Sequence, residues 1–331
     1  MRGLPIVAVS LAAAMALAAC GGGSSAQPGG NTTAQTGAFP VTVEHKLGKT
    51  EIKSEPKRVV TLGLSDHDAV VALGVKPVGV IDWFKERPWG NWPWLAGKLG
   101  DTPPEIVGER DEYNVEKIAS LKPDLILAHY SGIKKEQYDT LSQIAPVVAQ
   151  VPGFEDYGAP MQEMAKLTAK ALGRSAEMDR LIAEMDGKFK AVRDKHPEWA
   201  GKTALVADSF QAGNFAVFAD HDPKMKFMLD LGFKLPESIK KEVGKSNVVD
   251  YSYEKLDVLE ADRLVWLMSS PQVVEGIKGQ ELYKRTNVVK DDHVLYLTYQ
   301  DPPVGAAMSF NTVLSIPYAL DNVVPKLEAI K

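Results

Sequence analysis

The chain has 331 residues, of which 45% are hydrophobic and 24% are charged. This composition is typical of a globular protein, and the length allows two hydrophobic cores. The formal net charge of −5 argues against nucleic acid or an anionic membrane surface as the main partner, and no basic run supports either. The single cysteine, Cys20, leaves the folded part without disulfides or thiol chemistry.

The first 20 residues are typical of an export signal. Arg2 precedes an apolar run of small residues, which ends in Leu17-Ala18-Ala19-Cys20. This ending resembles a bacterial lipobox, in which the cysteine becomes the diacylated N-terminus. A plain secretory peptide with an incidental cysteine is the alternative. We expect lipidation at Cys20 and a lipid anchor at the outer face of the cell membrane. Residues 21–38 are rich in Gly, Ser, Thr and Gln and should form a flexible tether.

Residues 39–174 alternate short apolar runs with helical segments, and we expect them to form a first lobe. The predicted strands cover 41–43, 50–52, 58–62, 77–81, 124–128 and 147–151. The predicted helices cover 66–73, 116–121, with Asn114 as N-cap, and 135–144. Strands separated by helices indicate a mainly parallel α/β sheet.

One long amphipathic helix is predicted over residues 175–196. Its apolar side chains recur with a period of 3.6 residues, at Met178, Leu181, Ile182, Met185, Phe189 and Val192. Ser175 is a good N-cap, and Pro197 prevents continuation. At 1.5 Å per residue the helix would span roughly 30 Å, enough to connect two lobes.

Residues 197–331 repeat the same alternation and should form a second lobe. The predicted strands cover 203–207, 215–218, 263–268 and 293–297. The predicted helices cover 224–231, 253–259 and 311–326, where Pro317 could interrupt the last one. The sequence therefore predicts two α/β lobes joined by a single long helix.

Two short helices, one in each half, share a pattern. The segment 115–126 parallels the segment 253–264, and both place a glutamate in the first helical turn, Glu116 and Glu254. A carboxylate at this position interacts favourably with the helix dipole, which by itself explains the pattern.

The sequence resembles the solute-binding proteins of ABC importers for ferric siderophores, haem and cobalamin. The matching stretches, in chain order, are 56–62 (PKRVVTL), 72–80 (ALGVKPVGV), 116–126, 252–256 (SYEKL) and Ala261-Asp262. The resemblance covers residues 39–331 and implies two Rossmann-like lobes, a rigid connecting helix and a ligand cleft between the lobes. It also implies that Glu116 and Glu254 dock onto arginines of a membrane permease. We therefore expect a monomeric binding lipoprotein that captures a ferric siderophore and delivers it to that permease.

Ligands of open α/β sheets lie beyond the carboxyl ends of the strands. A siderophore already surrounds iron with its own oxygens, so the protein needs aromatic faces and hydrogen-bond donors rather than metal ligands. Four of the six tryptophans lie within residues 83–94; we expect Trp89 and Trp94 to be structural and the other two to face ligand. The full set of predicted ligand residues is Trp83, Arg87, Trp92, Arg110, Tyr130, Tyr157, Phe210, Asn214, Trp266 and Tyr299.

Acidic residues beside Arg87 and Arg110 disfavour a tris-catecholate complex and favour a neutral or weakly charged chelate, such as a hydroxamate or mixed-ligand siderophore. Haem is one alternative ligand, with an axial residue among Tyr130, Tyr157, Tyr299, Met268 and His67. A bare metal ion held near His67 and His129 is another, although no metal-binding spacing is present. No nucleophile elbow, P-loop or dinucleotide fingerprint supports an enzyme, and no intrinsic cofactor is expected.

Overall fold

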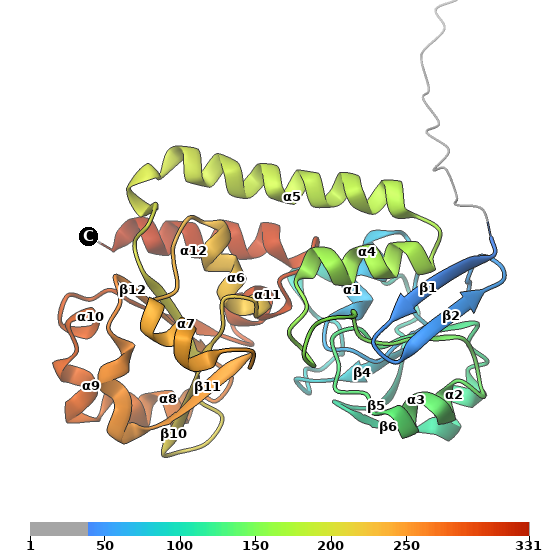
Figure 1. Ribbon diagram of the computed structural model, residues 1–331, viewed down its shortest axis with the longest axis horizontal. Coiled ribbons are helices and arrows are strands. Elements are labelled where there is room, and N and C mark those ends of the chain that lie inside the picture. The colour runs from blue at the N-terminus through green and yellow to red at the C-terminus, as the bar shows by residue number, and fades with distance from the viewer. Residues whose placement is uncertain (1–38, 331) are drawn as a thin grey trace, which may run out of the picture. The chain divides into compact units, whose positions relative to one another are not determined.

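The computed structural model describes residues 39–330, which belong to one compact unit (Figure 1). The predicted export signal, Cys20 and the tether 21–38 lie outside the described residues. Among the helices that are described, none combines the length and the apolar character needed to cross a membrane.

The first lobe is built on a six-stranded sheet with the strand order β6-β5-β4-β3-β7-β8. All neighbouring pairs in it are parallel except β5 with β6. A separate hairpin, β1–β2, packs against β8 and α4. The elements are β1 Val41–His45, β2 Gly48–Ile52, β3 Val59–Thr61, α1 Asp66–Ala72, β4 Gly79–Asp82, η1 Pro93–Leu95, β5 Glu105–Glu109, β6 Glu112–Tyr113, α2 Val115–Ser120, β7 Leu125–Leu127, α3 Lys135–Leu141, β8 Val147–Val148 and α4 Met161–Ala171.

The second lobe is built on a five-stranded sheet with the order β11-β10-β9-β12-β13. The elements are η2 Pro197–Trp199, β9 Ala204–Asp208, β10 Asn214–Phe218, α6 Pro223–Asp230, α7 Glu237–Val243, β11 Val248–Ser252, η3 Tyr253–Leu259, β12 Arg263–Met268, α8 Pro271–Lys278, α9 Glu281–Arg285, α10 Asn287–Lys290, β13 Val294–Thr298, α11 Val304–Phe310 and α12 Ser315–Ala329. This sheet is half antiparallel, because β10 pairs antiparallel with both β9 and β11. The connection 209–213 is too short for a crossover, so β9 and β10 form a hairpin.

The central strands are continuous apolar runs because both faces of each sheet are covered. Every residue of β3, β7, β9 and β12 is buried. In the first sheet Val60 lies opposite Ile126, and in the second Val265 lies opposite Val206. The carboxyl ends of these strands therefore come together at one edge of each sheet, where the sequence predicts the ligand residues.

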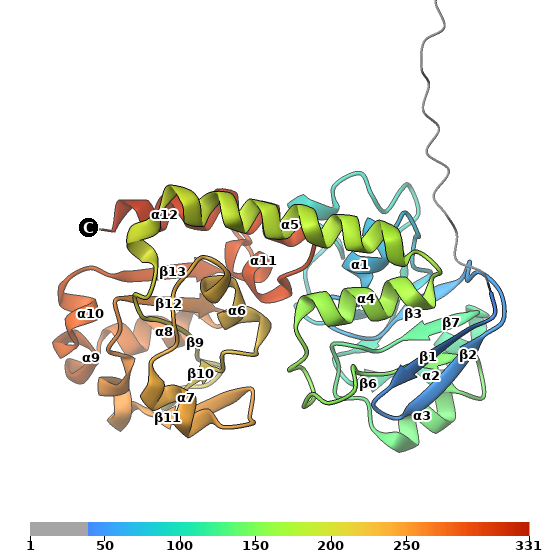
Figure 2. The same ribbon diagram turned by 45° about the horizontal axis from the view of Figure 1, so that its top comes forward.

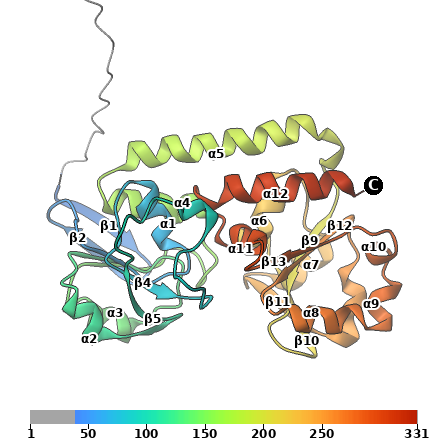
Figure 3. The same cartoon turned by 180° about the vertical axis from the view of Figure 1, so that it is seen from behind.

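Helix α5, Ser175–Lys195, connects the lobes and packs on α4 of the first and α12 of the second. Figure 2 and Figure 3 show it along the outside of both lobes. Four residues of the predicted apolar stripe, Met178, Ile182, Met185 and Phe189, are buried, and the other two, Leu181 and Val192, are partly buried. Ser175 is the first helical residue and makes no capping hydrogen bond, so its predicted capping role was wrong. The domain limits 39–174, 175–196 and 197–331 remain our prediction.

An aromatic seam joins the two lobes. Phe310 of α11 lies with its ring centroid 5.5 Å from those of Phe84 and Trp92 and 5.4 Å from that of Trp94. These first-lobe residues belong to the tryptophan-rich segment 83–94, and Phe310 is 1% exposed. One cluster of buried apolar side chains runs through the seam and into both lobes. Two of the four indoles of this segment, those of Trp92 and Trp94, therefore pack between the lobes.

Two predicted helices differ in detail. The 253–259 segment is a 3-10 helix, η3, with a kink at Lys255. Asn311 does not begin the last helix; it has a φ of 46° and ends α11. Helix α12 starts at Ser315 and continues past Pro317. Proline lacks a backbone N–H, but the N–H groups of the first helical turn have no acceptor within the helix, so no hydrogen bond is lost.

Candidate functional site

Three of the predicted aromatic side chains lie in a row at the edge of the first lobe. The Trp83 and Tyr157 ring centroids are 5.9 Å apart, and those of Tyr157 and Tyr130 are also 5.9 Å apart, both edge to face. At one end of the row the Arg110 guanidinium carbon lies 5.3 Å from the Trp83 ring centroid. We call these four residues the aromatic row. Trp83 and Tyr157 are partly buried and offer flat apolar faces, with the exposed Arg110 cation at the rim, whereas Tyr130 is buried.

Strand ends position the aromatic row. Trp83 directly follows β4, and Arg110, with a φ of 48°, lies in the turn between β5 and β6. The backbone of Tyr130 is held by Asp66, whose carboxylate accepts the N–H groups of Tyr130 at 3.0 Å, His129 at 2.8 Å and Gly63 at 3.1 Å. Asp66 thus ties together the carboxyl ends of β3 and β7.

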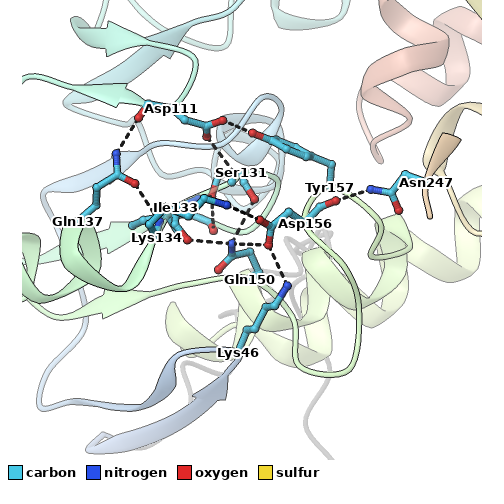
Figure 4. Close-up of polar contacts among 12 residues, drawn as sticks. Lys46, Asp111, Ser131, Ile133, Lys134, Gln137, Gln150, Asp156, Tyr157 and Asn247 are labelled. Atoms are coloured by element: carbon cyan, nitrogen blue, oxygen red, sulfur yellow. Dashed lines mark hydrogen bonds and ion pairs between the residues drawn. The ribbon is translucent and has the colours of Figure 1, made fainter. Parts of the chain in front are cut away.

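A polar network holds the loop that carries Tyr157 (Figure 4). Asp156 accepts hydrogen bonds from Lys46 at 2.8 Å, Lys134 at 3.0 Å and Gln150 at 3.1 Å. Burial acts to raise the pKa of Asp156, but the two lysines outweigh it and hold the pKa below its usual range. The ionised carboxylate therefore keeps its partners at neutral pH, and the loop is fixed against the first lobe.

The phenol groups of the row keep their protons at neutral pH. Tyr157 donates to Oδ2 of Asp111, whose Oδ1 also accepts the N–H of Gly132 at 2.9 Å. Burial, together with the bond to Asp111, raises the pKa of Tyr157. Burial raises the pKa of Tyr130 to about 12, although Lys224 opposes the shift.

The second lobe contributes a buried charged group that the sequence analysis missed. Lys224 of α6 donates a hydrogen bond from Nζ to the Tyr130 hydroxyl across the lobe boundary, at 3.1 Å. Asp208, at the end of β9, lies nearby; burial raises its pKa to about 7, against hydrogen bonds from Ser269 and Ser209. The strand-end rule could have found Asp208. No rule of this kind points to Lys224, because it lies within a predicted helix and does not follow a strand.

Other predicted residues of the second lobe lie near this group or on the surface beside it. Tyr299 shares a hydrogen bond of 2.6 Å with Ser309, and burial raises its pKa. Phe210 and Asn214 flank the β9–β10 turn, and both are exposed. Among residues 39–330, Phe210 is the one large hydrophobic side chain that is exposed, at 61%. An exposed phenylalanine next to Asp208 is consistent with a ligand-facing loop.

Three predicted ligand residues have other partners. Trp92 is buried and stacks on Trp94, with centroids 5.3 Å apart. Trp266 is buried inside the second sheet and donates from Nε1 to the Tyr283 hydroxyl at 2.8 Å. Arg87 is exposed and pairs with Asp82 at 2.8 Å. We therefore leave Trp92 and Trp266 out of the site that we propose, because packing already accounts for both. Trp89 and Trp94 are buried, as expected.

Two hollows lie elsewhere. One, of about 20 Å³, lies between α1, α4 and Thr312 and has room for about one water molecule. The other, of about 370 Å³, lies between α5 and α12. None of the predicted ligand residues lines it, and neither an aromatic ring nor an arginine does so. Neither hollow suits a flat chelate.

Comparison with known proteins identifies the type of molecule. The family model described as periplasmic binding protein matches residues 59–300. The chain belongs to this family. Its members bind solutes and are not enzymes, so the two lobes with their linking helix form a solute-binding protein.

Relatives of this periplasmic binding protein include substrate-binding and siderophore-binding lipoproteins. It is 31% identical to the putative ABC transporter substrate-binding lipoprotein YhfQ of Bacillus subtilis over 78% of this chain and 80% of that protein. It is also 31% identical to the probable siderophore-binding lipoprotein YfiY of the same organism, over 78% of this chain and 77% of that one. The structure of Streptococcus pneumoniae PiaA in complex with ferrichrome aligns with a TM-score of 0.74 at 30% identity, over 88% of this chain and 98% of that chain. The expected fold and protein class are confirmed.

The residues suggested for other ligands are already engaged. The candidate haem ligands Tyr130, Tyr157 and Tyr299 each have a hydrogen-bond partner, and His67 and Met268 are buried. His129 uses Nδ1 in a hydrogen bond with the Ala149 carbonyl at 2.9 Å. Within residues 39–330, no group of three or more His, Cys, Asp or Glu side chains is placed to hold a metal ion.

Proposed function

We propose that this protein captures a ferric siderophore and delivers it to the permease of an ABC importer. The observation that carries the proposal is the aromatic row, in which the partly buried rings of Trp83 and Tyr157 lie beside the Arg110 guanidinium, and the buried Tyr130 ring packs edge to face on Tyr157. A siderophore fills the coordination shell of iron with its own oxygens. Rings that stack on the chelator and donors that reach its oxygens are then sufficient for recognition.

The surroundings of Arg110 favour a chelate with little net charge. Glu109 pairs with Lys85 at 2.9 Å, and Asp111 is bonded to Tyr157. These carboxylates balance the positive charge at the rim, so a complex with several negative charges would gain little there. We therefore keep a neutral or weakly charged ferric complex as the preferred ligand class.

Delivery requires a surface that the permease can bind. Glu116 on α2 and Glu254 on η3 are both exposed, and neither makes a hydrogen bond or ion pair within residues 39–330. In Figure 1 and Figure 3, α2 lies on the side of its lobe away from α5, and so does α9, against which η3 packs. We propose that the two glutamates dock onto the permease while lipid on Cys20 holds the monomer at the membrane.

Calorimetric titration with a panel of ferric siderophores tests capture. Saturable binding of at least one complex is expected, and Trp83→Ala should weaken it about 3- to 10-fold. The matched control is Tyr138→Ala, which removes another aromatic ring beside a cation, Lys135, 5.6 Å from the ring centroid and outside the aromatic row. Haem belongs in the panel; a new visible absorption band would favour the haem alternative. Failure of every ferric complex to bind would refute the proposal.

A further inference from the structure

Lys224 occupies an unusual position for a cation. Its side chain is 13% exposed, and it is the second residue of α6, where the helix dipole disfavours positive charge. Burial of an ammonium group also costs hydration energy. Packing alone would be served as well by an apolar residue, since buried ion pairs are often replaced without loss of stability. A buried cation at this place therefore calls for a functional explanation.

The partners of Lys224 leave it partly available. Its Nζ contacts the Tyr130 hydroxyl at 3.1 Å and Oδ1 of Asp222 at 3.4 Å, and it lies 4.5 Å from the centroid of Phe218. An ammonium group has three donors, and here a neutral phenol takes one. Asp222 is already engaged as the N-cap of α6, where it accepts the Lys224 N–H at 2.9 Å.

The charge of Lys224 is maintained by its surroundings. Burial acts to lower the pKa of Lys224, but Asp222 and the phenol oxygens of Tyr130 and Tyr299 outweigh it, and the pKa is raised. Asp208 is also close enough to interact with Lys224, and its Oδ2 has no hydrogen-bond partner among the described side chains. The boundary beside the aromatic row thus contains a permanent ammonium group.

We propose that Lys224 is a specificity-determining residue, which donates a hydrogen bond to a negatively charged oxygen of the bound chelate in place of the Tyr130 hydroxyl. This inference rests on the proposed function and changes its ligand class in one respect: the complex carries an oxyanion where it meets Lys224, while the part that faces the Arg110 rim remains weakly charged. The class of ligand is a ferric complex that carries a carboxylate or other oxyanion in addition to the oxygens that satisfy iron. An oxyanion is a stronger partner for an ammonium group than a phenol is, so the exchange is favourable once the lobes separate.

The alternative is that the Lys224–Tyr130 hydrogen bond only holds the lobes together. Two variants distinguish this structural role from a role in ligand binding. Lys224→Met removes the charge and keeps the length, whereas Tyr130→Phe removes the bond between the lobes and keeps both the ring and the ammonium. Lys226→Met is the matched control, because Lys226 lies on the same helix and pairs with Asp230. Lys224→Gln repeats the test should Lys224→Met fail to fold, as judged by thermal unfolding.

The probes are ferrichrome, in which three hydroxamates leave the iron complex uncharged, and ferric citrate, which is negatively charged. Calorimetry on the folded protein measures both affinities. Lys224→Met should weaken ferric citrate binding at least about 30-fold and change ferrichrome binding less than about threefold. Tyr130→Phe should leave ferric citrate binding unchanged or tighter, since a competitor for Lys224 is lost, and Lys226→Met should change neither.

Equal losses for both complexes with Lys224→Met, or no loss, would overturn the inference. A loss of ferric citrate binding with Tyr130→Phe as large as with Lys224→Met would also overturn it, in favour of the bond between the lobes. If the wild-type protein binds ferrichrome but no anionic ferric complex, the inference about Lys224 is wrong and the proposed function stands. Wild-type protein that binds neither neutral nor anionic ferric complexes removes the proposed function as well.

Discussion

Asn247 of the second lobe donates a hydrogen bond from its side-chain amide to the backbone carbonyl of Asp156 in the first (Figure 4). The bond reaches the loop that carries Tyr157, so the lobes meet beside the aromatic row. Two residues further on, Gly158 lies so close that an added Cβ would collide with Oδ1 of Asn247. Any larger residue here would have to push the Asn247 amide aside.

The first prediction concerns this contact. Gly158→Ala should displace the Asn247 side chain, break its bond to Asp156 and lower stability by about 1 kcal/mol. Gly187→Ala is the control: Gly187 lies inside α5 with nothing near its Cβ position, so alanine there should stabilise by about 0.5–1 kcal/mol. Urea unfolding measures both. If Gly158→Ala is as stable as the wild type, the close approach has no energetic importance.

The second prediction concerns the aromatic seam. Phe310→Ala should lower the free energy of unfolding by about 3–5 kcal/mol, because it leaves a cavity among Phe84, Trp92 and Trp94. Phe210→Ala removes the same side chain from an exposed position and should change stability by less than about 0.5 kcal/mol. Similar losses for the two variants, measured by chemical denaturation, would contradict the structural role of the seam.

The third prediction concerns pH. Asp68 is buried and accepts a hydrogen bond from Thr312 of the second lobe at 2.5 Å, and its burial raises its pKa to about 7. The neighbouring His67, with Nε2 at 3.4 Å from Oδ1 of Asp68, supplies no positive charge, since burial lowers its pKa to about 3. Between roughly pH 4 and 7 the folded chain retains a proton on Asp68 that the unfolded chain has released. The contribution of Asp68 to stability therefore falls as pH rises through this window.

Asp68→Asn cannot release that proton. Its free energy of unfolding relative to the wild type should accordingly improve, by on the order of 2–4 kcal/mol, between pH 4 and pH 8. The contributions of the other titrating groups to the pH dependence are the same in both proteins and cancel in this difference. Urea denaturation of both proteins at pH 4, 6 and 8 measures it, and a difference that does not vary with pH would show that Asp68 titrates normally.

The fourth prediction concerns delivery. Reversing the charge of the two exposed glutamates, Glu116→Lys with Glu254→Lys, should abolish uptake of the ferric complex by cells and leave its binding to the purified protein intact. Glu136→Lys, on the exposed surface of α3, should affect neither. Lost binding in the double variant would exclude a docking role, and normal uptake would mean that the permease recognises another surface.

Local pattern was sufficient for much of the fold. The sequence predicted the helix 175–196 and the buried strands around Val60, Ile126, Val206 and Val265. Helical periodicity and continuous apolar runs depend only on residues that are close together in the chain. Helix α4 was not predicted, although its buried Met161, Met164, Ala165, Thr168 and Ala169 follow the helical period. Its stripe of small and polar residues is a weak signal of burial.

By itself, the sequence determined the two α/β lobes, the long helix between them and the aromatic residues at the strand ends, since these depend on residues close together in the chain. Only the tertiary structure decided which of those residues share a surface. Trp83 joins Tyr157 in the aromatic row while Trp92, nine positions away, seals the lobes, and Lys224 meets Tyr130 from 94 positions away. Such pairings depend on how two sheets pack, and no local periodicity encodes that packing.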